Sequence, residues 1–127
     1  MERPWLKIAG TVLSARDARE LAGCYSELLG WPMRGDESGW VVVRPDDVTH
    51  GLSFHEDTEY VAPTWPTTSD QQQMMVHLDI GTDDLDPAIE WAIGSGARLA
   101  DHQPQDGVRV LLDPAGHPFC LFATERF

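Results

Sequence analysis

Residues 77–84, His77-Leu78-Asp79-Ile80-Gly81-Thr82-Asp83-Asp84, decide the fold, because they open a module that occurs twice in the chain. A shift of 67 residues pairs His77 with Gly10 and Asp84 with Asp17, and it also pairs residues 117–121 with residues 50–54. An internal repeat dictates the architecture of a chain, since each copy forms the same structural unit. The sequence therefore predicts two similar halves.

Each half is predicted to contain one strand, one helix and three further strands. The first helix is expected at residues 17–29, because apolar residues recur at helical spacing between the capping pair Asp17 and Glu20 and the terminating Gly30. The second helix follows Asp84 and carries Pro87 in its first turn, where a missing N–H is tolerated. Short apolar segments bounded by Gly, Pro and Asp predict strands near 7–14, 31–36, 39–44, 50–55, 75–81, 98–101, 107–112 and 118–123.

A chain of 127 residues has the size of one domain. We expect a first module at about 6–56, a linker rich in Pro, Thr and Gln at about 57–73, and a second module at about 74–124. Neither half alone could bury both sides of a small sheet and a helix. The predicted fold class is therefore α+β, with the two halves forming one curved, mixed sheet and the helices outside it.

The charge is strongly acidic, with a formal net charge of -12. Such a surface repels nucleic acid and anionic membranes and attracts cationic ligands, although the acidity can also serve solubility alone. The first residues lack the apolar stretch of a secretory signal, and the longest apolar run, Phe119–Ala123, is far too short to span a membrane. Two cysteines do not make a secreted disulfide framework, so we expect a cytoplasmic protein with buried thiols.

Four segments carry a family resemblance. They are Tyr25-Ser26-Glu27-Leu28-Leu29-Gly30-Trp31, His77-Leu78-Asp79-Ile80, Asp83-Asp84-Leu85-Asp86 and Asp113-Pro114-Ala115-Gly116-His117-Pro118. In this order and spacing they resemble the vicinal oxygen chelate superfamily, which includes glyoxalase I, bleomycin-resistance proteins and extradiol dioxygenases, and above all its small glyoxalase-like proteins. The resemblance implies two tandem βαβββ modules that shape a cup, a divalent metal on the cup floor in metal-binding members, and a homodimer.

The positions that the resemblance assigns to metal ligands are occupied by Gly10, Ser53, His77 and Cys120. Only His77 is a standard ligand of a Zn, Fe, Mn or Ni site, and hydrogen bonding or packing is an equally good explanation of this residue. We therefore expect no metal cofactor. The alternative is a rearranged divalent-metal site made of His77, His55 and Cys120.

Strand alternation predicts which side chains line the cup. If His77 and Cys120 face the cup, Leu78, Ile80, Phe119 and Leu121 face the helices. Arg109 is placed on the cup side, which leaves Val110 and Leu112 in the core. The predicted ligand-binding residues are Trp40, His55, Trp65, His77, Asp79 and Arg109, and for Trp65 the alternative is that it only anchors the linker.

Three functions remain open. The first is metal-independent binding of a small cationic or aromatic molecule, resembling sequestration by bleomycin-resistance proteins. The second is a metal-dependent lyase, isomerase or dioxygenase of the glyoxalase superfamily, for which no catalytic residue is assigned. The third is a protein-interaction module without a ligand, which no residue specifically supports.

Overall fold

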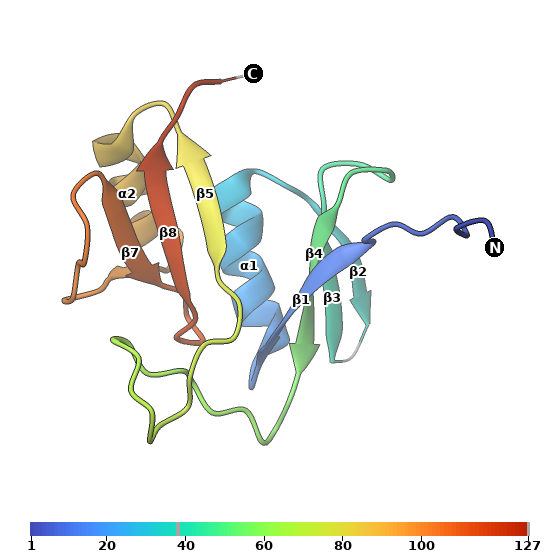
Figure 1. Ribbon diagram of the computed structural model, residues 1–127, viewed down its shortest axis with the longest axis horizontal. Helices are drawn as coiled ribbons and strands as arrows, with labels where there is room; N and C mark the ends of the chain where they lie inside the picture. The colour runs from blue at the N-terminus through green and yellow to red at the C-terminus, as the bar shows by residue number, and fades with distance from the viewer. Residues whose placement is uncertain (38, 127) are drawn as a thin grey trace.

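The computed structural model describes residues 1–37 and 39–126, and the expected order of elements occurs twice (Figure 1). The first module contains β1 (Gly10–Ala15), α1 (Ala18–Leu29), β2 (Met33–Glu37), β3 (Trp40–Val43) and β4 (Gly51–Glu56). The second module contains β5 (Leu78–Thr82), α2 (Leu85–Gly94), β6 (Arg98–Leu99), β7 (Val108–Leu112) and β8 (Pro118–Ala123). The predicted α+β class and the two tandem βαβββ modules are confirmed.

The strands form two four-stranded sheets, sheet A with the order β1-β4-β3-β2 and sheet B with the order β5-β8-β7-β6. Both sheets are mixed, because β1 runs parallel to β4 and β5 runs parallel to β8, whereas the other neighbours are antiparallel. The edge strands β1 and β5 are not paired with each other within the described residues. The curved wall of one chain therefore consists of two separate halves.

The ends of α1 follow from local sequence. The Asp17 carboxylate accepts a hydrogen bond of 3.0 Å from the Glu20 backbone N–H, and Gly30 ends the helix in the left-handed region with φ of 70°. The helix α2 begins after Asp84, whose side chain makes no capping hydrogen bond. No helix in the described part of the chain is long and apolar enough to cross a membrane.

The hydrophobic core joins the two modules around α1. The predicted helix-facing residues Leu78, Ile80, Phe119 and Leu121 do pack on the helix side of sheet B. The ring of Tyr25 lies 5.6 Å from the ring of Phe54 in sheet A and 5.9 Å from the ring of Phe119 in sheet B. The helix-facing sides of both sheets thus meet at α1, which lies between the sheets in Figure 1. The opposite sides, called here the open faces, are turned away from this core.

A buried polar network crosses the same boundary. The Tyr25 hydroxyl donates to Asp113 Oδ2 at 2.7 Å, and Asp113 Oδ1 accepts from the backbone N–H groups of Ala115 and His117. His117 Nε2 donates a hydrogen bond of 2.7 Å to the carbonyl oxygen of Ser14 in β1. Burial raises the pKa of Asp113, although His117 and these hydrogen bonds act in the opposite direction. The turn before β8 is therefore fixed to the first module.

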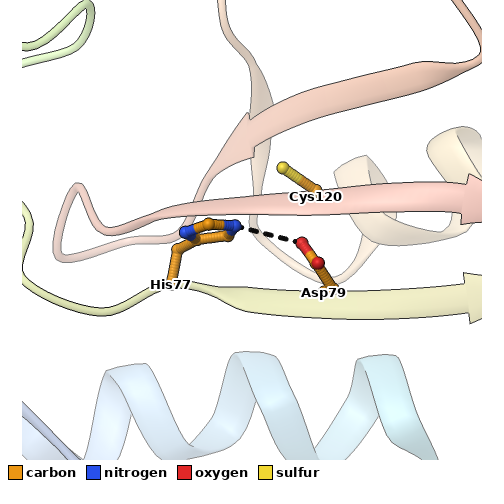
Figure 2. Close-up of side chains that lie close together, drawn as sticks. All are labelled: His77, Asp79 and Cys120. Atoms are coloured by element: carbon orange, nitrogen blue, oxygen red, sulfur yellow. Dashed lines mark ion pairs between the residues drawn. The ribbon is translucent and has the colours of Figure 1, made fainter.

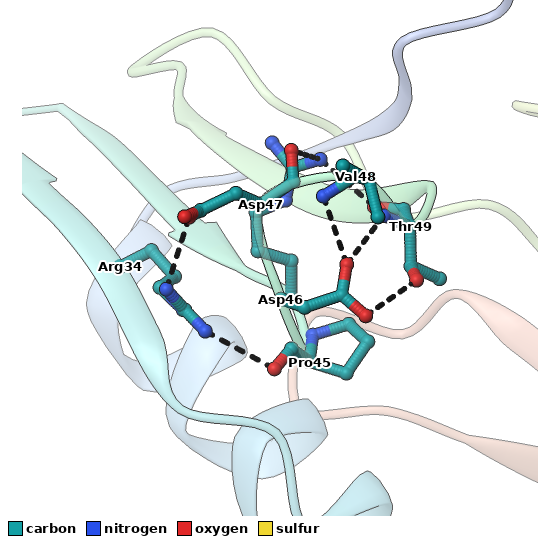
Figure 3. A network of polar contacts seen from close by, with 7 residues as sticks. Arg34, Pro45, Asp46, Asp47, Val48 and Thr49 are labelled. Atoms are coloured by element: carbon teal, nitrogen blue, oxygen red, sulfur yellow. Dashed lines mark hydrogen bonds and ion pairs between the residues drawn. The ribbon is translucent and has the colours of Figure 1, made fainter.

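The loop between β3 and β4 is closed by its own acidic residues (Figure 3). Asp46 accepts hydrogen bonds from the backbone N–H groups of Val48 and Thr49 and from the Thr49 hydroxyl. Arg34 of β2 pairs with Asp47 at 3.1 Å and donates to the Pro45 carbonyl oxygen at 3.1 Å. These short-range contacts hold the loop next to β2, on the side of the molecule opposite to the second module's strands.

Candidate functional site

Three potential ligand side chains converge on the open face of sheet B. His77 directly precedes β5 and Asp79 lies within it, so the two side chains emerge from the same face of the strand. Asp79 is the parallel partner of Cys120 in β8, and Cys120 is the antiparallel partner of Val110 in β7. Figure 2 shows the His77 and Asp79 side chains directed toward each other, with Cys120 beside them.

The three groups are close enough to act together. One ligand atom from each of His77, Asp79 and Cys120 lies within 4.8 Å of the others. His77 Nε2 lies 3.1 Å from Asp79 Oδ1, and the two side chains are 41% and 61% exposed, respectively. Burial, followed by the negative charge of Asp79 and a hydrogen bond to it, raises the pKa of the Cys120 thiol. Without a metal, the thiol therefore stays protonated at neutral pH and acts as a hydrogen-bond donor.

An apolar pocket of about 170 Å³ adjoins this cluster. His77 and Cys120 form its polar end. The remaining wall comes from the linker, from the loop before β7 and from the open face of sheet B, with lining residues Trp65, Met74, Pro104, Gln105, Val108, Val110 and Pro118. A cavity of about 150 Å³ accommodates a benzene ring. The pocket thus suits a group of the size of one aromatic ring with a polar substituent.

Trp65 is placed in this pocket by the linker. Its indole N–H donates to the carbonyl oxygen of His102 at 3.0 Å, and its side chain packs against the buried cluster of Ala100, Val110 and Leu112. Trp65 therefore contacts the segment that carries His102 and also lines the pocket, and its part in ligand binding stays a prediction.

Trp40 and His55 lie together, but on the open face of sheet A. They are cross-strand partners in β3 and β4, and their ring centroids are 6.2 Å apart. Trp40 is 40% exposed and His55 is exposed as well. The open faces of the two sheets are both turned away from the shared core. Within one chain, this pair therefore lies apart from the cluster of His77, Asp79 and Cys120 on sheet B.

The predicted orientation of Arg109 is wrong. Arg109 is the cross-strand partner of Leu121, so its side chain lies on the helix side of sheet B, where its guanidinium donates to the carbonyl oxygens of Val108 and Gln105. Val110 and Leu112 occupy the open face instead. The error is a slip of one residue in the alignment of β3 with β7, and such a slip exchanges the two faces of a strand.

The donor set does not match the four-ligand site of metal-binding relatives. Gly10 carries no donor atom and Ser53 offers only a hydroxyl, which is a poor ligand. His55, proposed from the sequence as a third ligand, belongs to sheet A. Asp79 takes its place beside His77 and Cys120. The two-residue spacing of His77 and Asp79 places both side chains on one face of a strand and so indicates this partner, whereas Asp79 was predicted only as a ligand-binding residue.

The comparisons with known proteins agree with this architecture. The family model described as a glyoxalase-like domain matches residues 10–122. No curated protein matches the sequence. Among solved structures, an enzyme of the glyoxalase/bleomycin resistance protein/dioxygenase family from Burkholderia phytofirmans PsJN superposes with a TM-score of 0.66 at 15% identity, over 92% of this chain and 98% of that chain.

Two further structures superpose equally well. A glyoxalase-related enzyme from Fulvimarina pelagi gives a TM-score of 0.65 at 18% identity, over 94% of this chain and 89% of that chain. The trypanothione-dependent glyoxalase I of Leishmania major gives 0.65 at 13% identity, over 94% of this chain and 87% of that chain. At such identities these similarities establish the fold alone. The family model matches most of the chain, residues 10–122, and therefore establishes the family. The protein therefore belongs to the glyoxalase-like domain family, within the vicinal oxygen chelate superfamily.

Proposed function

We propose that this protein binds a small, largely apolar molecule in the pocket of sheet B, without the divalent metal that catalytic relatives use. The pocket next to His77 and Cys120 carries this proposal, because it combines an apolar wall with a few polar groups, as small-molecule sites do. Gly10 and Ser53 support the metal-free form, since they supply no strong ligand. Sequestration of the bound molecule, as in bleomycin resistance, is the role that fits such a site.

The ligand class proposed is aromatic and cationic. Trp65 offers a flat ring to the pocket, and a cation near an aromatic face gains about 0.5–2 kcal/mol. Asp79 lies beside Cys120 at the polar end, where its carboxylate can pair with an ammonium group. The net charge of -12 would attract such a ligand from solution.

The proposal includes a homodimer in which a second copy completes the cup. The open face of sheet A exposes Trp40, His55 and Val12, and Val12 is 51% exposed. The strands β1 and β5 leave one edge each without a strand partner among the described residues, and such edges readily pair with another chain. Pairing sheet A of one protomer with sheet B of its partner would bring Trp40 and His55 toward the pocket. A cytoplasmic location also belongs to this proposal, since Cys24 and Cys120 are both free.

A second candidate is a metal-dependent lyase, isomerase or dioxygenase. One observation favours it, namely the convergence of His77, Asp79 and Cys120 on one open face. A metal held there would act as a Lewis acid on a substrate oxygen. In that case these three side chains would hold the ion, and the apolar wall around Trp65 would orient the substrate and exclude water.

Probe binding to metal-stripped protein tests the first candidate. Benzylammonium, benzyl alcohol and benzoate are titrated in the presence of a chelator, and binding is followed by calorimetry. We expect saturable binding of benzylammonium, which is lost in Trp65→Leu and retained in Trp5→Leu, a control in the exposed N-terminal segment. Binding that requires an added divalent ion would overturn the metal-free proposal in favour of the second candidate.

A further inference from the structure

We propose that the protein binds a small zwitterion with an apolar side group in a second pocket, distinct from the pocket of sheet B. This second pocket has a volume of about 270 Å³. It lies where the β1–α1 turn, the start of the linker and the turn before β8 meet, at the lower end of the molecule as drawn in Figure 1. The two pockets share no lining residue, so the inference does not depend on the ligand proposed above.

The walls of the second pocket are apolar and are held in place from both modules. They are formed by Ala15, Leu21, Tyr60, Ala62, Pro114 and Ala115. The Tyr60 hydroxyl donates to the Ala115 carbonyl oxygen at 2.8 Å, and the Tyr60 ring lies 5.3 Å from the ring of His117. The linker is also tied to β1, because the Asp57 N–H donates to the Ala15 carbonyl oxygen at 2.8 Å. The pocket is thus formed before a ligand arrives, which lowers the entropic cost of binding.

Arg16 supplies a cationic group at the rim of this pocket. Its Nε donates to the Tyr60 carbonyl oxygen at 3.1 Å, which fixes the side chain beside the pocket. Within residues 1–37 and 39–126, the two Nη atoms of Arg16 have no hydrogen-bond or ion-pair partner. A guanidinium group binds a carboxylate through two parallel hydrogen bonds. The Nη atoms of Arg16 are therefore available for the carboxylate of a ligand.

Asp17 and Glu20 provide the opposite charge at the same rim. Asp17 Oδ1 accepts the hydrogen bond of the Glu20 backbone N–H, and neither carboxylate forms an ion pair with Arg16 in the described part of the chain. The positive and negative groups thus remain separate. A ligand with one charge is attracted by one group and repelled by the other, whereas a ligand with an ammonium and a carboxylate group pairs with both.

The repeat indicates that the fold does not require these charges. The shift of 67 residues places Asp83 at the position of Arg16 and Pro87 at the position of Glu20. In both modules, nevertheless, the helix begins three residues after the first strand ends. The strand–helix connection therefore forms without this arginine and this glutamate, and ligand binding accounts for their presence in the first module.

Titration with three aromatic probes tests the inference, with binding followed by calorimetry. Phenylalanine carries both charges, phenethylamine only the ammonium group and phenylpropionate only the carboxylate. The comparison is made in Trp65→Leu, because the pocket of sheet B is proposed to take aromatic cations. We expect saturable binding of one phenylalanine per chain, with the same affinity in the wild type, and binding of the other two probes at least about tenfold weaker, since each lacks one charge-assisted contact. Absence of saturable phenylalanine binding in the wild type, or its loss in a folded Trp65→Leu variant, would overturn the second pocket.

Exchange of the rim charges provides the sharper test in the same background. Arg16→Gln should favour phenethylamine over phenylalanine, and Asp17→Asn/Glu20→Gln should favour phenylpropionate, because each change removes the charge that repels the singly charged probe. Asparagine still caps a helix, so the fold is retained. The matched control is Arg19→Gln, which removes the same charge, but Arg19 pairs with Asp36 and does not line the pocket. Phenylalanine affinity that is unchanged by Arg16→Gln, or lowered equally by Arg19→Gln, would overturn the proposed site.

Discussion

The Tyr25 hydroxyl donates a 2.7 Å hydrogen bond to Asp113 across the boundary between the two modules. Tyr25 belongs to α1, and Asp113 begins the turn that leads into β8. Both residues are buried, with Tyr25 0% and Asp113 2% exposed. A buried carboxylate needs hydrogen-bond donors because it is no longer solvated by water. The Tyr25–Asp113 hydrogen bond therefore links the relative position of the two modules to the stability of the fold.

Tyr25→Phe should lower the free energy of unfolding by about 1–3 kcal/mol. The variant keeps the ring contacts with Phe54 and Phe119 but leaves Asp113 Oδ2 without its donor. Urea denaturation followed by circular dichroism measures the change. In the double variant Tyr25→Phe/Asp113→Asn the loss should be smaller than the sum of the two single losses, and strict additivity would contradict the proposed coupling.

Asp113 should also make stability depend on pH. Its pKa is raised in the folded protein above the ordinary value of 3.8, so the folded state binds the proton more tightly than the unfolded state. The stabilisation is complete below pH 3.8 and is lost as the pH rises through the folded pKa. As the pH rises through this range, the free energy of unfolding of the wild type should therefore fall relative to that of Asp113→Asn. A difference that does not vary with pH would disprove the linkage.

Two glycines of α1, one within the helix and one at its C-terminal end, should respond oppositely to replacement by alanine. Gly23 lies inside the helix, and a Cβ added there would meet only Met33 Cε, at 3.9 Å. Gly23→Ala should raise the free energy of unfolding by roughly 0.5–1 kcal/mol, because alanine loses less backbone entropy in a helix. Gly30→Ala should lower the free energy of unfolding, since Gly30 has φ of 70°. Thermal and urea denaturation of both variants provide the measurement. A change of the same sign in the free energy of unfolding of both variants would contradict the prediction.

The proposed dimer depends on the open face of sheet A. Trp40→Glu should convert a dimer into a monomer, because it places a charge on the surface that the second copy would cover. Val48→Glu is the control, since Val48 is 79% exposed and lies in the β3–β4 loop away from that face. Light scattering coupled to size exclusion reports the mass. A wild-type protein that is monomeric at all concentrations would exclude this assembly.

Much of the secondary structure follows from local sequence. The capping residues Asp17 and Gly30 predicted both ends of α1, and the last strand was predicted with its observed bounds at Pro118–Ala123. The strands predicted at 7–14 and 75–81 begin later, at Gly10 and Leu78, because β4 and β8 supply pairing partners only from those residues onward. Local apolar pattern therefore located the strands, and pairing decided their starts.

The sequence by itself determined the repeat, the order of elements and the faces of β5 and β8, because helical and strand periodicities are local properties. The tertiary structure alone decided which residues share a site. The register of β7 places Arg109 at the position equivalent to buried Val41 rather than to Trp40, since their partners Leu121 and Phe54 correspond in the repeat. Likewise, only the packing of both sheets around Tyr25 separates Trp40 and His55 from His77, Asp79 and Cys120. Such relationships depend on contacts between residues far apart in the chain, which no local pattern encodes.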